Sequence, residues 1–311
     1  MRDKRVLVTG GAGFIGSHIA EFLSRDNSVL VLDDLSTGRE GNLSAFKERI
    51  EFCEGSILDF DLLKSRMSDV DFVFHEAALP SVERSIKDPI TTNLVNVRGT
   101  VNVLEAAREN NVEKVIYASS SSVYGASQTL PKVETMKPEP ISPYGVSKFA
   151  GELYCRIYYD IFDLRTTSLR YFNVYGPRQD PGSEYAAVVP KFITRALSGK
   201  KLIIYGDGNQ IRDFTFVLDC VKANVLAAEK KDCDGEILNR AYGTTTKVNE
   251  LAETVIELIG ENTGVEYAPP RPGEIRDSWA DISKARQLLG YEPGYSVRRG
   301  LKATIETYRR L

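Results

Sequence analysis

The sequence holds little of the material from which metal centres, disulfide frameworks and histidine catalysis are built. Its 311 residues include four cysteines, two histidines and one tryptophan. Neither a zinc site nor a disulfide framework is expected, because no C-x-x-C spacing occurs among Cys53, Cys155, Cys220 and Cys233. With only His18 and His75 available, acid and base chemistry would have to use tyrosine, lysine, serine or carboxylate groups, and no metal is expected.

Excess positive charge and long apolar runs are also missing. The net charge is −3, the isoelectric point is near 5.7, and basic stretches are no longer than a couple of residues. The chain therefore lacks the electrostatic footprint of a nucleic-acid-binding protein. The first residues, MRDKRVLVTGG, lack the apolar core of a signal peptide, and no apolar run approaches the length of a membrane span. We expect a cytoplasmic protein that binds neither nucleic acid nor membrane.

Short β-branched runs alternate with amphipathic stretches through the first half of the chain. Such alternation predicts an α/β fold, a doubly wound parallel sheet with helices on both faces. The runs expected to form strands are RVLVTG at 5–10, SVLVLDD at 28–34, IEFCEG at 50–55, VDFVFHEAA at 70–78, VEKVIYASS at 112–120 and LRTTSLRYFN at 164–173.

The pattern loosens after residue 173, where proline and glycine clusters separate shorter elements. We expect a sheet domain over residues 1–173 and a smaller C-terminal α/β domain over 174–311 that caps the strand ends. Part of 213–241 is expected to return to the first domain. No internal repeat or disordered linker is visible, so the two parts are expected to share one interface.

A glycine-rich turn, VLVTGGAGFIGSH at 6–18, lies between the first strand and a helix. It satisfies both G-x-x-G-x-x-G and G-x-G-x-x-G through Gly10, Gly11, Gly13 and Gly16. Glycines let the backbone turn sharply and approach a pyrophosphate closely, while the helix N-terminus supplies free N–H groups and a positive dipole. The turn predicts a dinucleotide-binding, Rossmann-like domain rather than a plain structural turn.

An acidic residue, Asp33, ends the second predicted strand, where dinucleotide-binding folds place a ribose ligand. Its carboxylate would accept hydrogen bonds from the adenosine ribose hydroxyls and repel a 2′-phosphate. The expected cofactor is therefore NAD rather than NADP. Arg39 could hold a 2′-phosphate, but the carboxylates of Asp33 and Asp34 oppose that role, and we interpret Arg39 as an ordinary loop residue.

Tyr144 and Lys148, in SPYGVSK, are four residues apart at the start of a predicted helix. This spacing places both side chains on one helix face. The pair could simply face solvent. A phenol with a pKa near 10 is a poor base at neutral pH, but an adjacent ammonium together with a cationic nicotinamide stabilises the phenolate. Tyr144 is therefore a candidate proton acceptor.

Together, the glycine turn, the serines before VYG, the Tyr144-x-x-x-Lys148 pair and the run RYFNVYGPR resemble the extended short-chain dehydrogenase/reductase family over essentially the whole chain. Within that family the sequence is most similar to the UDP-glucose (UDP-galactose) 4-epimerases and their nearer relatives. The resemblance implies that Ser120 binds the sugar 4-hydroxyl, Tyr144 removes its proton, and Lys148 holds the nicotinamide ribose and lowers the pKa of Tyr144.

The resemblance also implies the residues that contact NAD. They are Gly10, Gly13, Phe14, Ile15, Gly16, Asp33, Asp34, Ser36, Ile57, Ala77, Ala78, Leu79, Asn96, Tyr144, Lys148 and Tyr171. Relatives that eliminate water carry an acidic pair after the catalytic hydroxyl residue, where this chain has Ser121 and Ser122. Hydroxyls near their normal pKa cannot serve as general acid and base for a dehydration, so oxidation and reduction at one carbon is favoured. A serine-rich strand end without chemistry is the alternative.

A UDP-sugar site in the C-terminal domain is implied by the same resemblance. Arg212 and Arg271 would bind the pyrophosphate, because a guanidinium can bridge two phosphate oxygens, and Tyr205 would stack on uracil. The remaining implied ligands, besides Ser120 and Tyr144, are Asn173, Val189, Ile203, Glu274 and Ser278. Ser278 stands where relatives use a bulky tyrosine to exclude N-acetyl groups, unless the local loop differs and Ser278 points elsewhere.

The activity implied is a nucleotide-sugar 4-epimerase that interconverts UDP-glucose and UDP-galactose, and also their N-acetylated forms, by transient oxidation at C4. Two alternatives stay open: a related enzyme acting on UDP-glucuronate, as epimerase or decarboxylase, and a catalytically silent NAD-binding regulator. The helical runs 92–108 and 145–162 are apolar on more than one face. Pairing through these helices would give the family's homodimer, although packing within a monomer explains the pattern almost as well.

Overall fold

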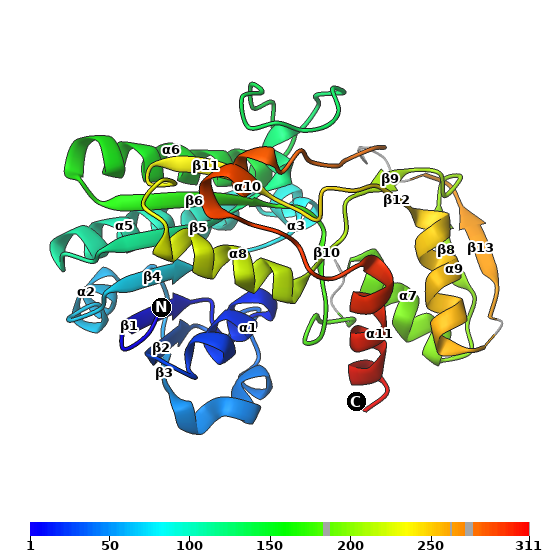
Figure 1. The fold of residues 1–311 in the computed structure, drawn as a ribbon, viewed down its shortest axis with the longest axis horizontal. Helices are drawn as coiled ribbons and strands as arrows, with labels where there is room; N and C mark the ends of the chain where they lie inside the picture. The colour runs from blue at the N-terminus through cyan, green and yellow to red at the C-terminus, as the bar shows by residue number, and fades with distance from the viewer. Residues whose placement is uncertain (183–186, 262, 271–275, 311) are drawn as a thin grey trace.

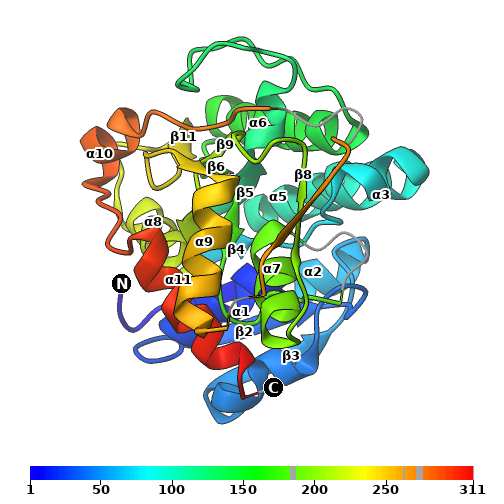
Figure 2. The same cartoon turned by 90° about the vertical axis from the view of Figure 1, so that its right-hand side faces the viewer.

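The structure is a computed structural model that describes residues 1–182, 187–261, 263–270 and 276–310. A large sheet domain carries the N-terminus, and a smaller lobe beside it carries the C-terminus (Figure 1). Turning the molecule brings the smaller lobe forward, with α9, α11 and α7 in front of the sheet (Figure 2). Their bounds are Val248–Ile259, Val297–Tyr308 and Val188–Leu197.

The sheet domain is built on seven parallel strands in the order β11-β6-β5-β4-β1-β2-β3. The six strands expected from the sequence are all present, and a seventh is added at the edge next to β6. The strands are β1 (Arg5–Thr9), β2 (Ser28–Asp33), β3 (Ile50–Glu54), β4 (Phe72–His75), β5 (Lys114–Ser120), β6 (Arg165–Tyr171) and β11 (Glu236–Arg240). The predicted doubly wound, Rossmann-like α/β fold is therefore confirmed.

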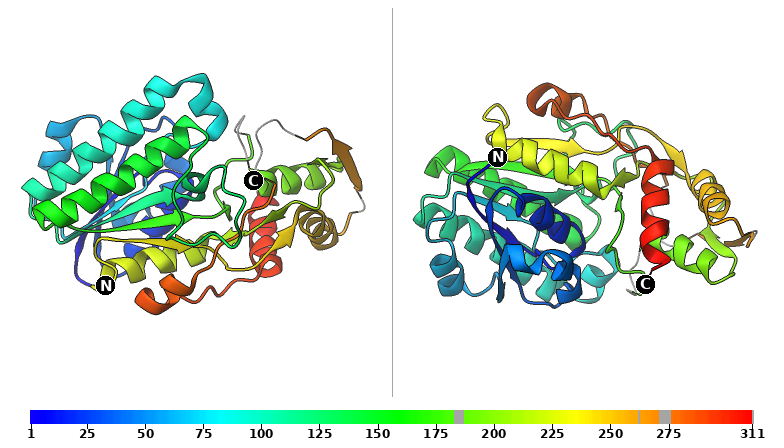
Figure 3. Two further views of the ribbon diagram at one scale, coloured as in Figure 1. Left: turned by 90° about the horizontal axis from the view of Figure 1, so that it is seen from above. Right: turned by 60° about the horizontal axis from the view of Figure 1, so that its bottom comes forward.

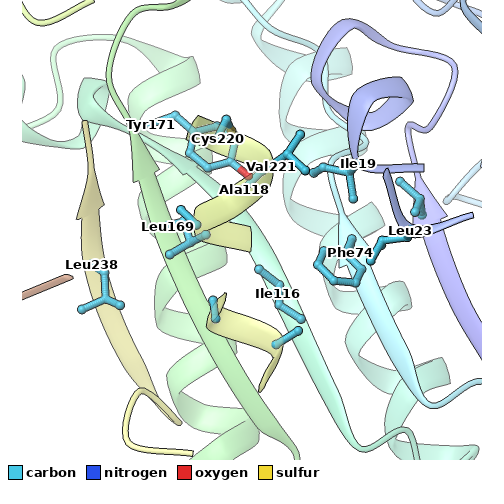
Figure 4. Close-up of a cluster of buried hydrophobic side chains, with 14 of the residues drawn as sticks. Ile19, Leu23, Phe74, Ile116, Ala118, Leu169, Tyr171, Cys220, Val221 and Leu238 are labelled. Carbon is cyan, nitrogen blue, oxygen red and sulfur yellow. The ribbon is translucent and has the colours of Figure 1, made fainter. Parts of the chain in front are cut away.

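Helices cover both faces of this sheet, because alternate residues of each buried strand point to opposite sides. In β1, Val6 and Val8 pack with α1 (Phe14–Leu23) and α8 (Val217–Glu229), whereas Leu7 packs on the face covered by α2 (Phe60–Arg66), α5 (Gly99–Glu109) and α6 (Pro143–Phe162). Figure 3 shows α6 beside α5 on its face. The core under α1 and α8 includes Ile19, Leu23, Phe74, Ile116, Leu169 and Val221 (Figure 4).

The helical run predicted over 92–108 is not one continuous α-helix. It consists of α4 (Pro89–Asn93), a π-helical turn η2 (Leu94–Arg98) and α5. The wider π-helical turn contains the buried Asn96, whose side chain bonds across to another segment. Local π geometry inside helices frequently accompanies functional sites, where it aims one side chain differently from its neighbours. Three further short helical segments are η1 (Glu40–Arg49), α3 (Val82–Lys87) and η3 (Ser121–Tyr124).

The smaller lobe has its own apolar core, formed where α7, α9 and α11 pack against β8 (Leu202–Tyr205), which pairs with β13 (Val265–Ala268). The short pairs β7 (Val174–Tyr175) with β10 (Thr215–Phe216), and β9 (Ile211–Arg212) with β12 (Thr246–Lys247), lie between it and the sheet. The chain re-enters the sheet domain through α8 and β11, and again through α10 (Ser283–Leu289), which packs on β11. In the described part of the chain, no helix is long and apolar enough to cross a membrane.

Candidate active site

A cleft of about 230 Å³ lies along the carboxyl ends of the central strands. This edge of a doubly wound sheet is where such folds bind their ligands. The cleft is lined by every residue expected to contact NAD except Asn96, namely Gly10, Gly13, Phe14, Ile15, Gly16, Asp33, Asp34, Ser36, Ile57, Ala77, Ala78, Leu79, Tyr144, Lys148 and Tyr171. Residues far apart in the sequence thus form one continuous surface.

The glycine turn has no room for side chains. Gly10 has a φ of +68°, and a Cβ there would lie 2.6 Å from the backbone nitrogen of Ala77. A Cβ on Gly16 would lie 2.2 Å from the carbonyl oxygen of Gly10. The turn is therefore fixed against the start of α1 and against the segment after β4, and Phe14 and Ile15, which begin the helix after the turn, line the cleft. Such a cradle fits the pyrophosphate of a dinucleotide.

Asp33 is buried at the end of β2 and organises the loop around the adenosine side of the cleft. Its two carboxylate oxygens accept hydrogen bonds from the backbone N–H groups of Ala12 and Leu35, both at 2.9 Å. Burial raises the pKa of Asp33, while these hydrogen bonds act in the opposite direction. Arg39 does not line the cleft and forms a salt bridge of 2.6 Å with Asp180. The arrangement agrees with our interpretation of Arg39 as a loop residue.

Asn96 supports the cleft rather than lining it. Its Oδ1 accepts from the Leu79 N–H at 2.7 Å, and its Nδ2 donates to the Leu79 carbonyl at 3.1 Å and to the Ser147 hydroxyl at 3.1 Å. The amide therefore ties the segment after β4 to α6. The structure places Asn96 behind the cofactor-lining residues, which differs from the direct contact that we expected.

Tyr144 and Lys148 occupy successive turns at the start of α6, which is capped by the Ser142 hydroxyl accepting from the Gly145 N–H at 3.1 Å. The buried Lys148 ammonium donates to the carbonyl oxygen of Ala118 at 2.7 Å. Burial lowers the pKa of Lys148 to about 8. The alternative interpretation, in which the pair faces solvent, is therefore wrong for Lys148.

Tyr144 behaves differently from our expectation that Lys148 lowers its pKa. Burial raises the pKa of Tyr144 above its ordinary value, and the hydrogen bond with Ser120 acts in the opposite direction. Within the chain itself, loss of solvation dominates over charge stabilisation of the phenolate. An additional positive charge is required before Tyr144 can act as a base at neutral pH.

The serine run divides into separate roles. The Ser119 hydroxyl donates to Glu152, whose carboxylate also binds Arg170 through two hydrogen bonds of 2.8 and 2.7 Å, so this serine belongs to a buried structural network. Ser120 ends β5 beside Tyr144, and its Oγ accepts from the Ser122 N–H at 3.1 Å. The run therefore combines a packed strand end with a hydroxyl that is hydrogen-bonded to Tyr144.

Glu76 is a lining residue that the sequence analysis missed. It follows β4 directly, and its carboxylate accepts a hydrogen bond of 2.6 Å from the hydroxyl of Tyr171. Burial raises the pKa of Glu76 to about 7. A signal was present in the sequence, since HEAA puts a carboxylate directly after the strand FVFH, at the edge where parallel sheets bind ligands.

A second cavity of about 290 Å³ lies between the lobes' connecting segment and the smaller lobe. It brings together five of the residues expected to bind a UDP-sugar: Asn173, Val189, Ile203, Tyr205 and Arg212. Asn173 follows Tyr171 of the first cleft by two residues, so the segment after β6 links the two cavities. An aromatic ring, a guanidinium and an amide thus line one cavity beside the first.

The remaining expected ligands are placed less directly. Arg271 and Glu274 lie outside the described residues. Ser278 pairs with Arg212 through its backbone, donating to the Ile211 carbonyl at 3.0 Å and accepting from the Asp213 N–H at 3.0 Å. It is half-buried next to the second cavity without being among the residues that line it. Within the described ranges, no group of three His, Cys, Asp or Glu side chains is arranged to hold a metal ion.

The fold and the cleft define a dinucleotide-binding protein of the Rossmann type with a tyrosine and a lysine at the reacting end. The sequence matches the NAD dependent epimerase/dehydratase family over residues 6–241, and the chain belongs to that family. The predicted family resemblance is confirmed, and NAD is the cofactor. When bound, NAD accepts a hydride from a substrate and can return it.

Individual relatives differ in the sugar that their names specify. A UDP-glucose 4-epimerase of Mycolicibacterium smegmatis is 41% identical over 98% of both chains. A UDP-N-acetylglucosamine 4-epimerase from Methanobrevibacter ruminantium, solved with UDP-N-acetylmuramic acid, is 40% identical, with a TM-score of 0.96 over 100% of this chain and 99% of that one. A Bacillus cereus UDP-glucuronic acid 4-epimerase, solved with UDP-glucuronic acid and NAD, is 36% identical, with a TM-score of 0.91 over 98% and 99%.

We predict that Gly16→Ala weakens NAD binding at least about tenfold, because its Cβ would overlap the Gly10 carbonyl and force the phosphate turn open. The matched control is Gly41→Ala, whose Cβ would meet no heavy atom within 4 Å. Calorimetric titration of each folded variant with NAD gives the comparison. Equal affinity of Gly16→Ala and the wild type would show that the turn does not hold the pyrophosphate.

Proposed function

We propose that the protein is a UDP-sugar 4-epimerase that acts on UDP-glucose and UDP-galactose and also accepts their N-acetylated forms. The observation that supports this most is the adjacency of two cavities. One is lined by Tyr144 and Lys148 at the carboxyl edge of the sheet, with Ser120 hydrogen-bonded to Tyr144, and the other is lined by Tyr205 and Arg212 beside the smaller lobe. Their separation suits a substrate with a reacting sugar at one end and a nucleotide at the other.

In the proposed reaction, Ser120 binds the sugar 4-hydroxyl and Tyr144 takes its proton. Lys148, fixed on Ala118, holds the nicotinamide ribose and contributes positive charge. The cationic nicotinamide adds the further charge that the Tyr144 phenolate requires. Arg212 and Tyr205 keep the nucleotide anchored while the sugar turns over, so the hydride can return to its opposite face. Binding strength placed on the nucleotide leaves the sugar free to rotate.

Two related activities are less well supported. A dehydration would need an acid and base after Ser120, but the following positions are Ser121 and Ser122. A UDP-glucuronate 4-epimerase or decarboxylase would need a cation for the uronate carboxylate. The charged side chains that line the first cleft are Asp33, Asp34, Glu76 and Lys148, and Lys148 already donates to the Ala118 carbonyl. A silent NAD-binding regulator would not need the complete Ser120, Tyr144 and Lys148 set.

Tyr144→Phe is expected to abolish epimerisation of UDP-galactose, a loss of at least about 10²-fold in kcat, because the proton acceptor is removed. Affinity for NAD and for UDP should stay within a factor of a few. Turnover is measured by separating the UDP-sugar products, and binding by calorimetry. Near-normal epimerisation by this variant would overturn the role of Tyr144, while a wild type inactive on every UDP-sugar tested would overturn the proposed function.

Sugar choice is predicted to depend on Ser278. A serine leaves space that a tyrosine would fill, and steric exclusion is an effective way for a pocket to reject a larger substrate. Ser278→Tyr should therefore reduce kcat/KM for UDP-N-acetylglucosamine by at least about tenfold while changing that for UDP-glucose far less. Product analysis with both sugars on both proteins checks this. Either a wild type that ignores acetylated sugars or a variant with unchanged preference would contradict the assignment.

A homodimer formed through α6 is also proposed. Val146, Leu153, Ile157 and Ile161 are 44–67% exposed and share one face of α6. Ile86 of α3 and Ile90 of α4, 63% and 80% exposed, extend this apolar surface onto the neighbouring helices. A contiguous apolar surface of this kind is typical of an interface. A second copy related by a two-fold axis would cover it, because the same face is then buried on both chains.

Ile157→Glu is expected to convert the dimer to a monomer, because it places a charge in the centre of the apolar surface. The matched control is Phe22→Glu on α1, which changes an equally exposed apolar residue (45%) on another helix. Light scattering coupled to size exclusion reports the mass of each. A monomeric wild type, or a dimer that survives Ile157→Glu, would refute this interface.

A further inference from the structure

Glu76 stands next to the proposed reacting groups, although neither the expected triad nor the expected cofactor ligands include it. It lines the same cleft as Tyr144 and Lys148. Its carboxylate is held by the Tyr171 hydroxyl at 2.6 Å, and that hydroxyl is in turn held by the Asn224 side chain, with Nδ2 at 2.8 Å. The position of Glu76 is thus fixed by side chains from β6 and α8.

Strand register places this carboxylate beside the reacting pair. Glu76 follows His75, which pairs with Tyr117 of β5, so it lies at the level of Ala118, whose carbonyl accepts from Lys148. Tyr171 pairs with Ser120, the hydrogen-bond partner of Tyr144.

The other titratable groups near Glu76 are Cys220 on α8 and Arg240 at the end of β11. The guanidinium of Arg240 is buried over the Tyr171 ring, 4.9 Å from its centroid, and is not among the groups that line the cleft. Within the described residues, its three nitrogens have no hydrogen-bond acceptor.

We propose that Glu76, fixed by Tyr171 in the cleft that Tyr144 and Lys148 also line, is a positioning residue whose negative charge favours the ammonium form of Lys148 and opposes the phenolate form of Tyr144. The inference rests on the proposed role of Tyr144 as the proton acceptor. Charge explains both effects: a carboxylate favours the protonated form of a nearby amine and disfavours the anion of a nearby phenol. Both directions hold for this carboxylate, which raises the pKa of Lys148 and of Tyr144.

The pH dependence of activity depends on the protonation states of Tyr144 and Lys148. Tyr144 must lose a proton to act as the base, and Lys148 must keep one to stabilise the phenolate. Removing the Glu76 charge lowers the pKa of both groups, so both limbs of the activity profile move toward lower pH. A residue that merely packed against Tyr171 would leave both limbs in place. Glu76 itself, with its pKa raised to about 7, is about half ionised at neutral pH and fully ionised only at higher pH.

Glu76→Gln tests the proposal, because the amide keeps the shape and the acceptor for Tyr171 but removes the charge. We expect both limbs of the kcat/KM profile to shift down by about one pH unit in the NAD-loaded enzyme. A direct readout, which needs no turnover, is the titration of Tyr144 followed by NMR with ring-labelled tyrosine, its signal assigned from Tyr144→Phe. The control is Glu54→Gln, which removes a carboxylate at the end of β3, away from the reacting pair.

A downward shift of the Tyr144 titration in Glu76→Gln, absent from Glu54→Gln, supports the proposal. An unchanged or raised Tyr144 pKa in a folded, NAD-binding Glu76→Gln protein overturns it. If Glu76→Gln does not fold, Tyr171→Phe is the second test. The Tyr171 hydroxyl favours the ionised form of Glu76, so without it Glu76 stays neutral to a higher pH. A smaller downward shift of the Tyr144 pKa is therefore expected in Tyr171→Phe. No shift there overturns the proposal as well. Failure of the proposed function is distinguished by a wild type that turns over no UDP-sugar.

Discussion

The arrangement of Lys148, Tyr144 and Ser120 depends on one buried hydrogen bond, from the Lys148 ammonium to the carbonyl of Ala118 near the end of β5. An uncompensated ammonium in this position would cost several kcal/mol, so α6 cannot slide along the sheet without losing stability. Tyr144 lies one turn earlier on α6 and is fixed by the same contact. Ser120, two residues after Ala118, then meets the phenol from the strand side. One contact therefore aligns all three groups.

A second buried charge connects the two lobes. Asp213, fully buried between β9 and β10, accepts hydrogen bonds from the N–H groups of Tyr242 at 2.9 Å and Gly243 at 3.0 Å. Its own carbonyl accepts from Asn173 at 3.1 Å, at the point where the chain leaves β6. The segment that carries Arg212 is thereby attached to the end of the sheet. Hydrogen bonds between these side chains and the backbone therefore hold the two cavities beside each other.

The glycine turn and the Tyr144–Lys148 pair could be predicted because local sequence pattern fixes them, whereas other expected cofactor ligands, such as Ala77 and Tyr171, came from the family resemblance. Gly10 and Gly16 sit in a turn that only glycine can form, and Tyr144 and Lys148 share a helix face by spacing alone. Asn96 could not be placed in this way, since its direction depends on a π-helical turn that apolar periodicity does not reveal. Glu76 was missed for another reason: its position is fixed by a hydrogen bond from Tyr171, which is 95 residues away in the sequence.

The pKa shifts of Lys148, Tyr144 and Glu76 in the cleft have the same main cause. Burial disfavours every charge, so it lowers the pKa of Lys148 and raises those of Tyr144 and Glu76. With pKa values of about 8 and about 7, Lys148 is mostly protonated at pH 7 and Glu76 is about half ionised, whereas burial keeps the Tyr144 phenol protonated. The Glu76 carboxylate opposes the Tyr144 phenolate, so a cation brought by a ligand is what allows Tyr144 to hold a negative charge.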